Sequence, residues 1–257
     1  KQTPTPADAK VAILCFVPET ISRILSYWKH YLEFGNTFAF KPKFIIVDGD
    51  LKLIDNYAKE FKDYLELYSH KNLHAVRSID FFYKNKFRKL QFRGLYSYHF
   101  LKNFERNFRL LNSVLRINSN SLLSPIRLHP EAFQQIMIEN TAQAHALYSD
   151  NYAVSLLSKI LKEFKVECDN RALTSIVVVI PQLMDLAVSP LITDSYGDFY
   201  RNLSSSVKCL DLTSLFRAQE DIPSLYIEDH YGGHLSAKGN ELVANYLHIY
   251  LNSIGEV

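Results

Sequence analysis

The sequence IVVVIP at residues 176–181 is an unbroken run of β-branched apolar side chains that ends at a proline. A run this short and this apolar is typical of a strand that is buried on both faces, as in a parallel sheet. Similar runs occur at Val11–Phe16, at residues 44–47 and at residues 207–210. The sequence therefore predicts a sheet whose strands are mostly parallel.

Helical patterns separate these predicted strands. Apolar residues recur at helical spacing over residues 19–34, 151–164 and 238–251. Strands that alternate with amphipathic helices indicate an α/β fold in which helices cover both faces of the sheet. We expect a three-layer arrangement of the flavodoxin-like kind.

Residues 56–120 depart from this alternation, because the stretch is long, helical in pattern and rich in Phe, Tyr, Lys and Arg. No Pro-, Gly- or Ser-rich linker divides the chain. We therefore expect a single domain over residues 1–257 that carries a helical insertion at about residues 56–120.

The basic and aromatic residues of this insertion could also suit a nucleic-acid surface. However, Phe100, Phe104 and Phe108 share one helical face, whereas Lys102 and Arg106 fall elsewhere. A helix with an apolar inner side and a solvated basic side explains this pattern more simply. Nucleic acid is therefore not expected as a partner. The alternative explanation of the basic residues is contact with an anionic substrate or a membrane surface.

The overall composition, with 47% apolar residues, 22% charged residues and a formal net charge of +2 over 257 residues, is that of an ordinary globular protein. No apolar run reaches the roughly 18 residues that a membrane span needs, so no transmembrane segment is expected. The N-terminal KQTPTP has no apolar signal core. The compartment stays open between the cytoplasm and export after removal of a signal or anchor.

The cysteines and histidines do not indicate a metal or cofactor. Cys15, Cys168 and Cys209 are too scattered for a disulfide framework or a zinc site. Cys15 and Cys209 lie in apolar runs and are expected to be small buried side chains. His230 and His234 are four apart on a glycine-containing loop rather than on a helix, which does not suit a two-histidine zinc site. We expect neither a metal nor a cofactor.

The sequence LYIEDHYGGHLSAKGNELVA at residues 225–244 places an acid and a histidine on a glycine-bearing loop directly before a helix. Such a loop can hold an imidazole over the carboxyl end of a sheet, while a nearby carboxylate fixes its tautomer. Ser236 stands where a side chain would cap the helix. The loop could therefore be catalytic, or it could be a capping loop with an incidental histidine.

Within this stretch, HLSAKGN followed by LVA resembles the last conserved block of the SGNH (GDSL-type) esterases and acyltransferases. The resemblance implies that His234 is a general base and that Asp229 is its carboxylate partner. The acid of the family usually stands three positions before the histidine, where this chain has Tyr231. The glycine pair at 232–233 could restore the geometry, because glycine allows backbone turns that are closed to other residues. If the glycine pair does not restore the geometry, either Glu228 or no carboxylate is the partner of His234.

Residues 11–20 and 41–50 are similar in order and spacing to the second and third blocks of the same family. In that register Pro18 replaces an oxyanion-hole glycine, and Gly49, followed by a matching Asp50, replaces an oxyanion-hole asparagine. The resemblance thus implies an oxyanion region at Gly49 and Asp50 that has lost two donors.

The Gly-Asp-Ser element that supplies the nucleophile in this family does not occur in the sequence. Three registers are open. Val11–Phe16 could be the second strand of the family, with the serine block preceding Lys1. Residues 49–51 could instead be a relic of the element, or a degenerate first block could lie at residues 16–18. The first register is favoured, because the distance from Pro18 through one helix to residue 49 suits one crossover unit.

Two functions follow from the resemblance. One is an ester hydrolase or O-acyltransferase that acts on an acyl ester of a small molecule, glycan or lipid. The other is a catalytically degenerate module of the same fold that binds a glycan or partner without turning it over. The missing serine and oxyanion donors favour the second function, and the His234 segment favours the first, which we prefer. A third reading is an unrelated α/β protein whose last helix merely resembles the family, because a resemblance of motif does not itself establish chemistry.

Overall fold

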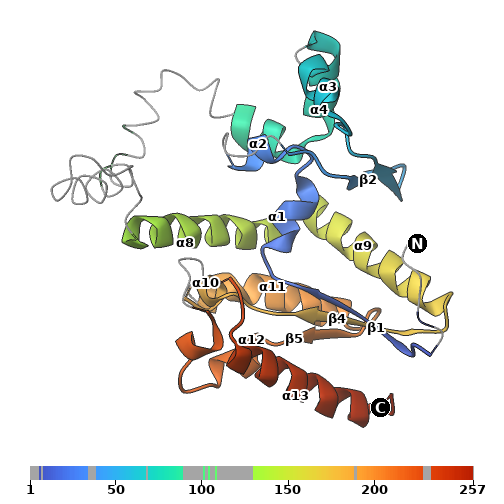
Figure 1. Ribbon diagram of the computed structural model, residues 1–257, viewed down its shortest axis with the longest axis vertical. Helices are drawn as coiled ribbons and strands as arrows, with labels where there is room; N and C mark the ends of the chain where they lie inside the picture. The colour runs from blue at the N-terminus through green and yellow to red at the C-terminus, as the bar shows by residue number, and fades with distance from the viewer. Residues whose placement is uncertain are drawn as a thin grey trace. The chain divides into compact units, whose positions relative to one another are not determined.

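The computed structural model describes residues 6, 8–33, 39–67, 69–88, 101, 104, 108, 130–187, 190–227 and 233–256 (Figure 1). The chain forms two compact units. The first unit consists of residues 1–20 and 133–257, and the second consists of residues 21–132. The second unit thus lies, in sequence, between the first strand and the rest of the first unit.

The first unit contains a parallel sheet of three strands in the order β1-β4-β5. The strands are β1 (Val11–Phe16), β4 (Thr174–Val179) and β5 (Cys209–Asp211). All three were predicted, and both pairings are parallel. The central strand β4 is fully buried at residues 176–179, in keeping with the all-apolar run that predicted it.

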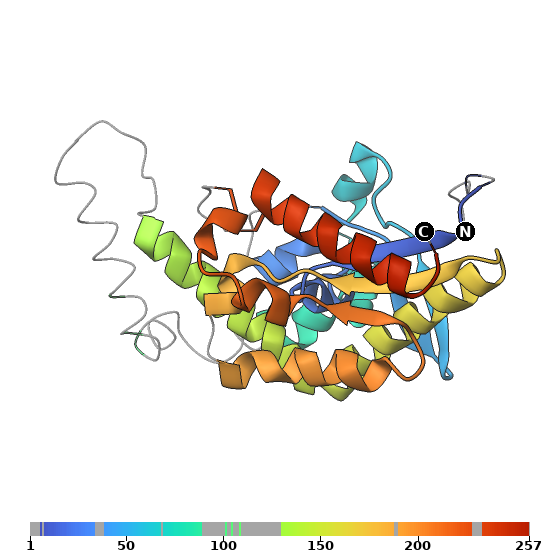
Figure 2. The ribbon, with the colours of Figure 1, turned by 90° about the horizontal axis from the view of Figure 1, so that it is seen from below.

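Helices lie on both faces of this small sheet. On one face lie α9 (Asn151–Asp169), which contacts β4, and α11 (Pro190–Leu203), which contacts β5. On the other face, α12 (Thr213–Arg217) and α13 (Ala237–Ser253) form an apolar core with β4 through Ile176, Phe216 and Val243. Figure 2 shows α13 running across the strands.

Shorter elements complete this unit. They are α8 (Pro130–Ala146), the 3₁₀ turn η2 (Leu147–Ser149), α10 (Leu183–Ala187) and the 3₁₀ turn η3 (Pro223–Leu225). The α/β class is therefore confirmed, although the parallel sheet is small. Among the described helices, none combines the length and apolar composition that a bilayer crossing requires.

One predicted strand belongs to a different sheet. β2 (Lys43–Val47) pairs antiparallel with β3 (Asp50–Ile54) in the second unit, so its assignment to the parallel sheet was wrong. The two residues between the strands, Asp48 and Gly49, have φ values of 52° and 90°. Positive φ at both positions defines a type I′ turn, for which Asp-Gly is a favoured pair. The turn folds the chain back at once and excludes a helical crossover.

The helix predicted over residues 19–34 is also interrupted. α1 (Thr20–Leu25) and α2 (Lys29–Glu33) are separated by residues 26–28. The fully buried carboxylate of Asp80 accepts the amide protons of Tyr27 and Trp28 at 2.8 and 2.9 Å. This carboxylate replaces the helical carbonyl acceptors at the break. Local periodicity could not reveal the break, because its acceptor lies far along the sequence.

The described part of the insertion predicted at residues 56–120 is helical. It contains α3 (Phe61–Glu66), α4 (His70–Ile79) and the π-helical turn η1 (Tyr83–Phe87). Most of residues 89–120 lie outside the described residues. The cysteine prediction fails at one position: Cys15 is exposed on the edge strand β1, and Cys209 is partly buried.

Candidate functional site

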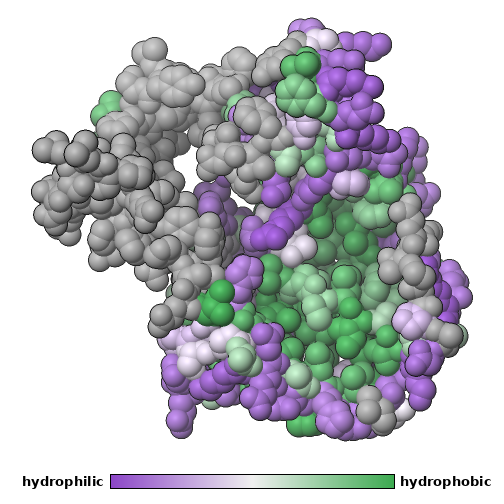
Figure 3. All heavy atoms as spheres, in the orientation of Figure 1, coloured by the Kyte–Doolittle hydropathy of each residue, from purple (hydrophilic) through white to green (hydrophobic). Residues whose placement is uncertain are grey.

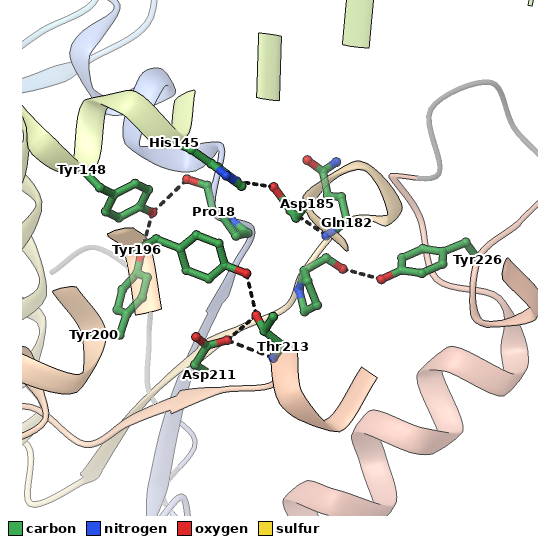
Figure 4. Close-up of polar contacts among 11 residues, drawn as sticks. Pro18, His145, Tyr148, Gln182, Asp185, Tyr196, Tyr200, Asp211, Thr213 and Tyr226 are labelled. Carbon is green, nitrogen blue, oxygen red and sulfur yellow. Dashed lines mark hydrogen bonds and ion pairs between the residues drawn. The ribbon is translucent and has the colours of Figure 1, made fainter. Parts of the chain in front are cut away.

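The segment that carries His234 is fastened to the carboxyl end of β4. Tyr226 pairs with Leu235 in an antiparallel bridge, and the Ile227 amide donates to the His234 carbonyl at 3.1 Å. The buried Tyr226 hydroxyl donates to the carbonyl of Pro181, which follows β4, at 2.7 Å (Figure 4). Open α/β sheets place their ligands at this end of the strands.

The residues that produce the SGNH resemblance have identifiable structural roles. The Ser236 hydroxyl accepts the Gly239 amide proton at 3.2 Å and caps α13, as predicted. It also donates to the Ser224 carbonyl at 2.7 Å. A Cβ at Gly239 would lie 2.2 Å from the Leu225 carbonyl oxygen, so only glycine allows the first turn of α13 to pack there. The cap at Ser236 and the close packing at Gly239 together hold the loop in place.

The His234 side chain itself is exposed. Its expected partner Asp229 and the alternative Glu228 lie outside the described residues, as does His230. The pairing of His234 with a carboxylate therefore stays a prediction.

The predicted oxyanion residues lie in the second unit. Gly49 and Asp50 are exposed at the turn between β2 and β3. Their assignment rests on the similarity of residues 41–50 to a family block, and their oxyanion role stays a prediction. Pro18 lies at the carboxyl end of β1, and its carbonyl accepts a hydrogen bond from the Tyr148 hydroxyl at 2.9 Å.

A buried polar network that sequence reasoning missed lies at the carboxyl ends of the three parallel strands (Figure 4). Its centre is a hydrogen bond between His145 Nε2, near the end of α8, and Asp185 Oδ1, on α10, at 2.7 Å. Both side chains are fully buried. The other Asp185 oxygen accepts the Gln182 amide proton at 2.7 Å, which fixes the start of α10 after β4.

Two further groups of hydrogen bonds, each containing tyrosines, lie at the ends of the other two strands, and the Tyr196 ring contacts the His145 ring at 5.1 Å between centroids. The Tyr148 hydroxyl lies 2.9 Å from the Tyr200 hydroxyl. It also donates a hydrogen bond to the carbonyl of Pro18, just after β1. The Tyr196 hydroxyl lies 2.7 Å from that of Thr213, which donates to Asp211 at the end of β5 at 2.6 Å. Burial raises the pKa values of all three tyrosines, so they remain neutral hydroxyls.

The network can align the strand ends, but solvent does not reach its central pair. Because both the imidazole of His145 and the carboxylate of Asp185 are fully enclosed, the exposed His234 is the better candidate for contact with a substrate. Nothing local in the sequence distinguished His145, whose partner is 40 residues away. Among the described residues, no group of three or more His, Cys, Asp or Glu side chains could hold a metal ion.

A scan against protein-family models, a search of curated proteins and a search of solved structures each find no match for the chain. The likeness to SGNH enzymes therefore rests on the residues of the His234 segment. The likeness stays a prediction. Substitution of His234, and of the residues that hold its segment in place, tests it.

Proposed function

We propose that the chain is an ester hydrolase or O-acyltransferase of the SGNH type, with His234 as general base and Asp229 as the residue that orients it. One observation carries the proposal: an exposed histidine sits on a loop that Tyr226 anchors to the carboxyl end of a parallel strand. The helix cap at Ser236 holds the other side of the same loop. The parallel sheet with its flanking helices would then be the core of the three-layer SGNH fold.

In this mechanism His234 removes the proton of an attacking hydroxyl while the hydroxyl oxygen bonds to the acyl carbon. The ester oxygen then leaves with that proton as an alcohol. Water, or a second alcohol in a transferase, takes the acyl group in the following step. The substrate is an acyl ester of a small molecule or glycan.

A binding module of the same fold is the second candidate, and the strand ends favour it. Among the two residues that follow each of β1, β4 and β5, only Thr213 carries a hydroxyl. That hydroxyl is buried and contacts both Asp211 and Tyr196. It is thus held in the network rather than presented as a nucleophile.

Hydrolysis of 4-nitrophenyl acetate by the purified protein tests the enzymatic proposal. We expect His234→Asn to lower the rate by about 10²–10⁴-fold, the usual contribution of a general base. His248→Asn is the matched control, because His248 is exposed on α13 and its Nε2 contacts only the nearby Asn252 side chain among the described residues. Labelling with a fluorophosphonate, followed by peptide mapping, identifies the nucleophile.

A rate that His234→Asn leaves unchanged would remove His234 from the mechanism. If neither turnover nor labelling occurs and an acetylated oligosaccharide still binds, the second candidate is supported instead.

A further inference from the structure

The second unit contains a pocket of about 630 Å³ that is independent of the His234 segment. Aromatic rings form much of its wall, among them Trp28, Tyr31, Tyr64 and Phe87. Leu65, Leu67 and Leu73 add aliphatic surface. The pocket volume falls in the range of small-molecule sites. The lining is also typical of such sites, which are concave and mostly apolar with a few placed polar groups.

Packing holds the inner wall in one arrangement. The Tyr31 ring lies 4.8 Å from both the Trp28 and Phe87 rings, measured between centroids, and is almost fully buried. The buried carboxylate of Asp80 fixes the main chain at Trp28 by accepting the Trp28 amide proton. Rings held in this way form a preformed surface, which lowers the entropic cost of binding.

The rim of the pocket is apolar and open to solvent. Phe61 and Leu65 lie four residues apart on α3, and 78% and 61% of their surfaces are exposed. Figure 3 shows apolar side chains at the surface of α3. Neighbouring exposed apolar residues at a pocket mouth are typical of a ligand site.

Arg77 supplies a positive charge to this apolar wall. Its Nε donates to the Tyr31 hydroxyl at 3.3 Å, and its guanidinium carbon lies 5.0 Å from the centre of the Tyr83 ring. Both partners are neutral, and no carboxylate among the described residues forms an ion pair with Arg77. A guanidinium positioned in this way can bind a planar anion by donating hydrogen bonds from its terminal nitrogens.

We propose that this pocket binds a fatty carboxylate, with the acyl chain among the rings and leucines and the carboxylate on Arg77. The apolar wall selects a flexible hydrocarbon, because a sugar would leave many hydroxyls without partners there. Among the described residues of the wall, Arg77 carries the permanent positive charge, whereas burial lowers the pKa of His30, the other basic side chain, so one negative charge at one end of the ligand fits best. Binding does not depend on the proposed ester chemistry.

Trp28 is the only tryptophan of the chain, so its fluorescence reports directly on this pocket. We expect dodecanoate to change the Trp28 emission saturably below its micellar concentration. Affinity should rise about fourfold with each methylene from octanoate upward, until the chain fills the pocket. Calorimetry on the same samples provides an independent affinity.

The charge requirement is tested with Arg77→Gln, for which we expect roughly tenfold or greater weakening for dodecanoate and little change for dodecanol. Arg77→Lys should restore part of the affinity. Arg88→Gln, which removes an exposed charge outside the pocket, is the matched control. Circular dichroism verifies that each variant folds.

Equal affinity for dodecanoate and dodecanol, or binding that Arg77→Gln leaves unchanged, would overturn the proposal, as would the absence of binding by both methods. His234→Asn should bind dodecanoate like the wild type. Failure of the ester proposal and failure of this one are therefore distinguishable.

Discussion

The imidazole of His145 and the carboxylate of Asp185 lie 2.7 Å apart at the carboxyl end of the parallel sheet, and neither side chain is exposed to solvent. Asp185 also accepts the Gln182 amide proton, so one carboxylate connects α8, α10 and the loop after β4. Removing the Asp185 carboxylate takes away the buried acceptor of both His145 Nε2 and the Gln182 amide, and each such loss costs about 1–3 kcal/mol.

We predict that Asp185→Ala lowers the free energy of unfolding by about 2–6 kcal/mol. Urea denaturation followed by circular dichroism measures this loss. Asp198→Ala, at an exposed ion pair with Arg201 on α11, is the control and should change stability by less than about 1 kcal/mol. Similar losses in both variants would show that the buried pair does not stabilise the unit.

The contact between Gly239 and the Leu225 carbonyl supports a second prediction. Gly239→Ala must displace the first turn of α13, because the added Cβ would lie 2.2 Å from a backbone oxygen. We expect a loss of about 1–3 kcal/mol in the free energy of unfolding, together with a loss of any activity that depends on His234.

Gly197→Ala on α11 is the matched control. There the added Cβ would make only an ordinary contact of 3.8 Å with an Asp211 oxygen, and alanine is the better helix former. Thermal unfolding of the two variants should shift in opposite directions. A Gly239→Ala variant as stable as the wild type would contradict the close packing.

Local signals were sufficient for much of the first unit. The apolar runs at β1 and β4 and the cap at Ser236 depend on nearby residues alone, and all three were predicted correctly. The hairpin at Asp48 and Gly49 was missed, although Asp-Gly beside a strand is a recognised turn signal. The resemblance to a parallel α/β family outweighed that signal.

The polar network could not be predicted in the same way. His145 and Asp185 are 40 residues apart, and Tyr148 lies 130 residues from Pro18. Such pairs form because folding brings strand ends together, and no sequence periodicity encodes them. The break in the first helix has the same origin, since its acceptor Asp80 is 52 residues from Trp28.

The hydrogen bond from Tyr226 to Pro181 supports a third prediction. Tyr226→Phe keeps the ring in the core but leaves the buried Pro181 carbonyl without this donor, at a cost of about 1–3 kcal/mol. Tyr250→Phe is the control, because that ring packs against the same core without a hydrogen bond from its hydroxyl among the described residues. Equal stability of the two variants in urea would show that the anchor is unimportant.

Lys43 in the second unit supports a prediction on pH. Its side chain is 4% exposed and donates to the Leu25 and Ile79 carbonyls at 2.5 and 3.2 Å. Burial lowers the pKa of Lys43 from 10.5 to about 8, helped by the charges of Lys41 and Lys84 and opposed by Asp80. Between these pKa values the unfolded chain binds a proton at this lysine that the folded chain does not, so stability rises with pH.

The slope that Lys43 contributes should approach 1.4 kcal/mol per pH unit between its folded and unfolded pKa values. Tyrosines and cysteines also titrate in this range, so the measurement compares the wild type with Lys43→Met by urea denaturation from pH 7 to pH 10. We expect the stability of the wild type relative to the variant to be constant below about pH 7.5 and to increase above pH 8. Lys43→Met also removes two donors, but that loss is independent of pH and shifts the level rather than the slope. Parallel curves across the whole range would mean that the lysine keeps its ordinary pKa in the folded protein, in contradiction to its burial.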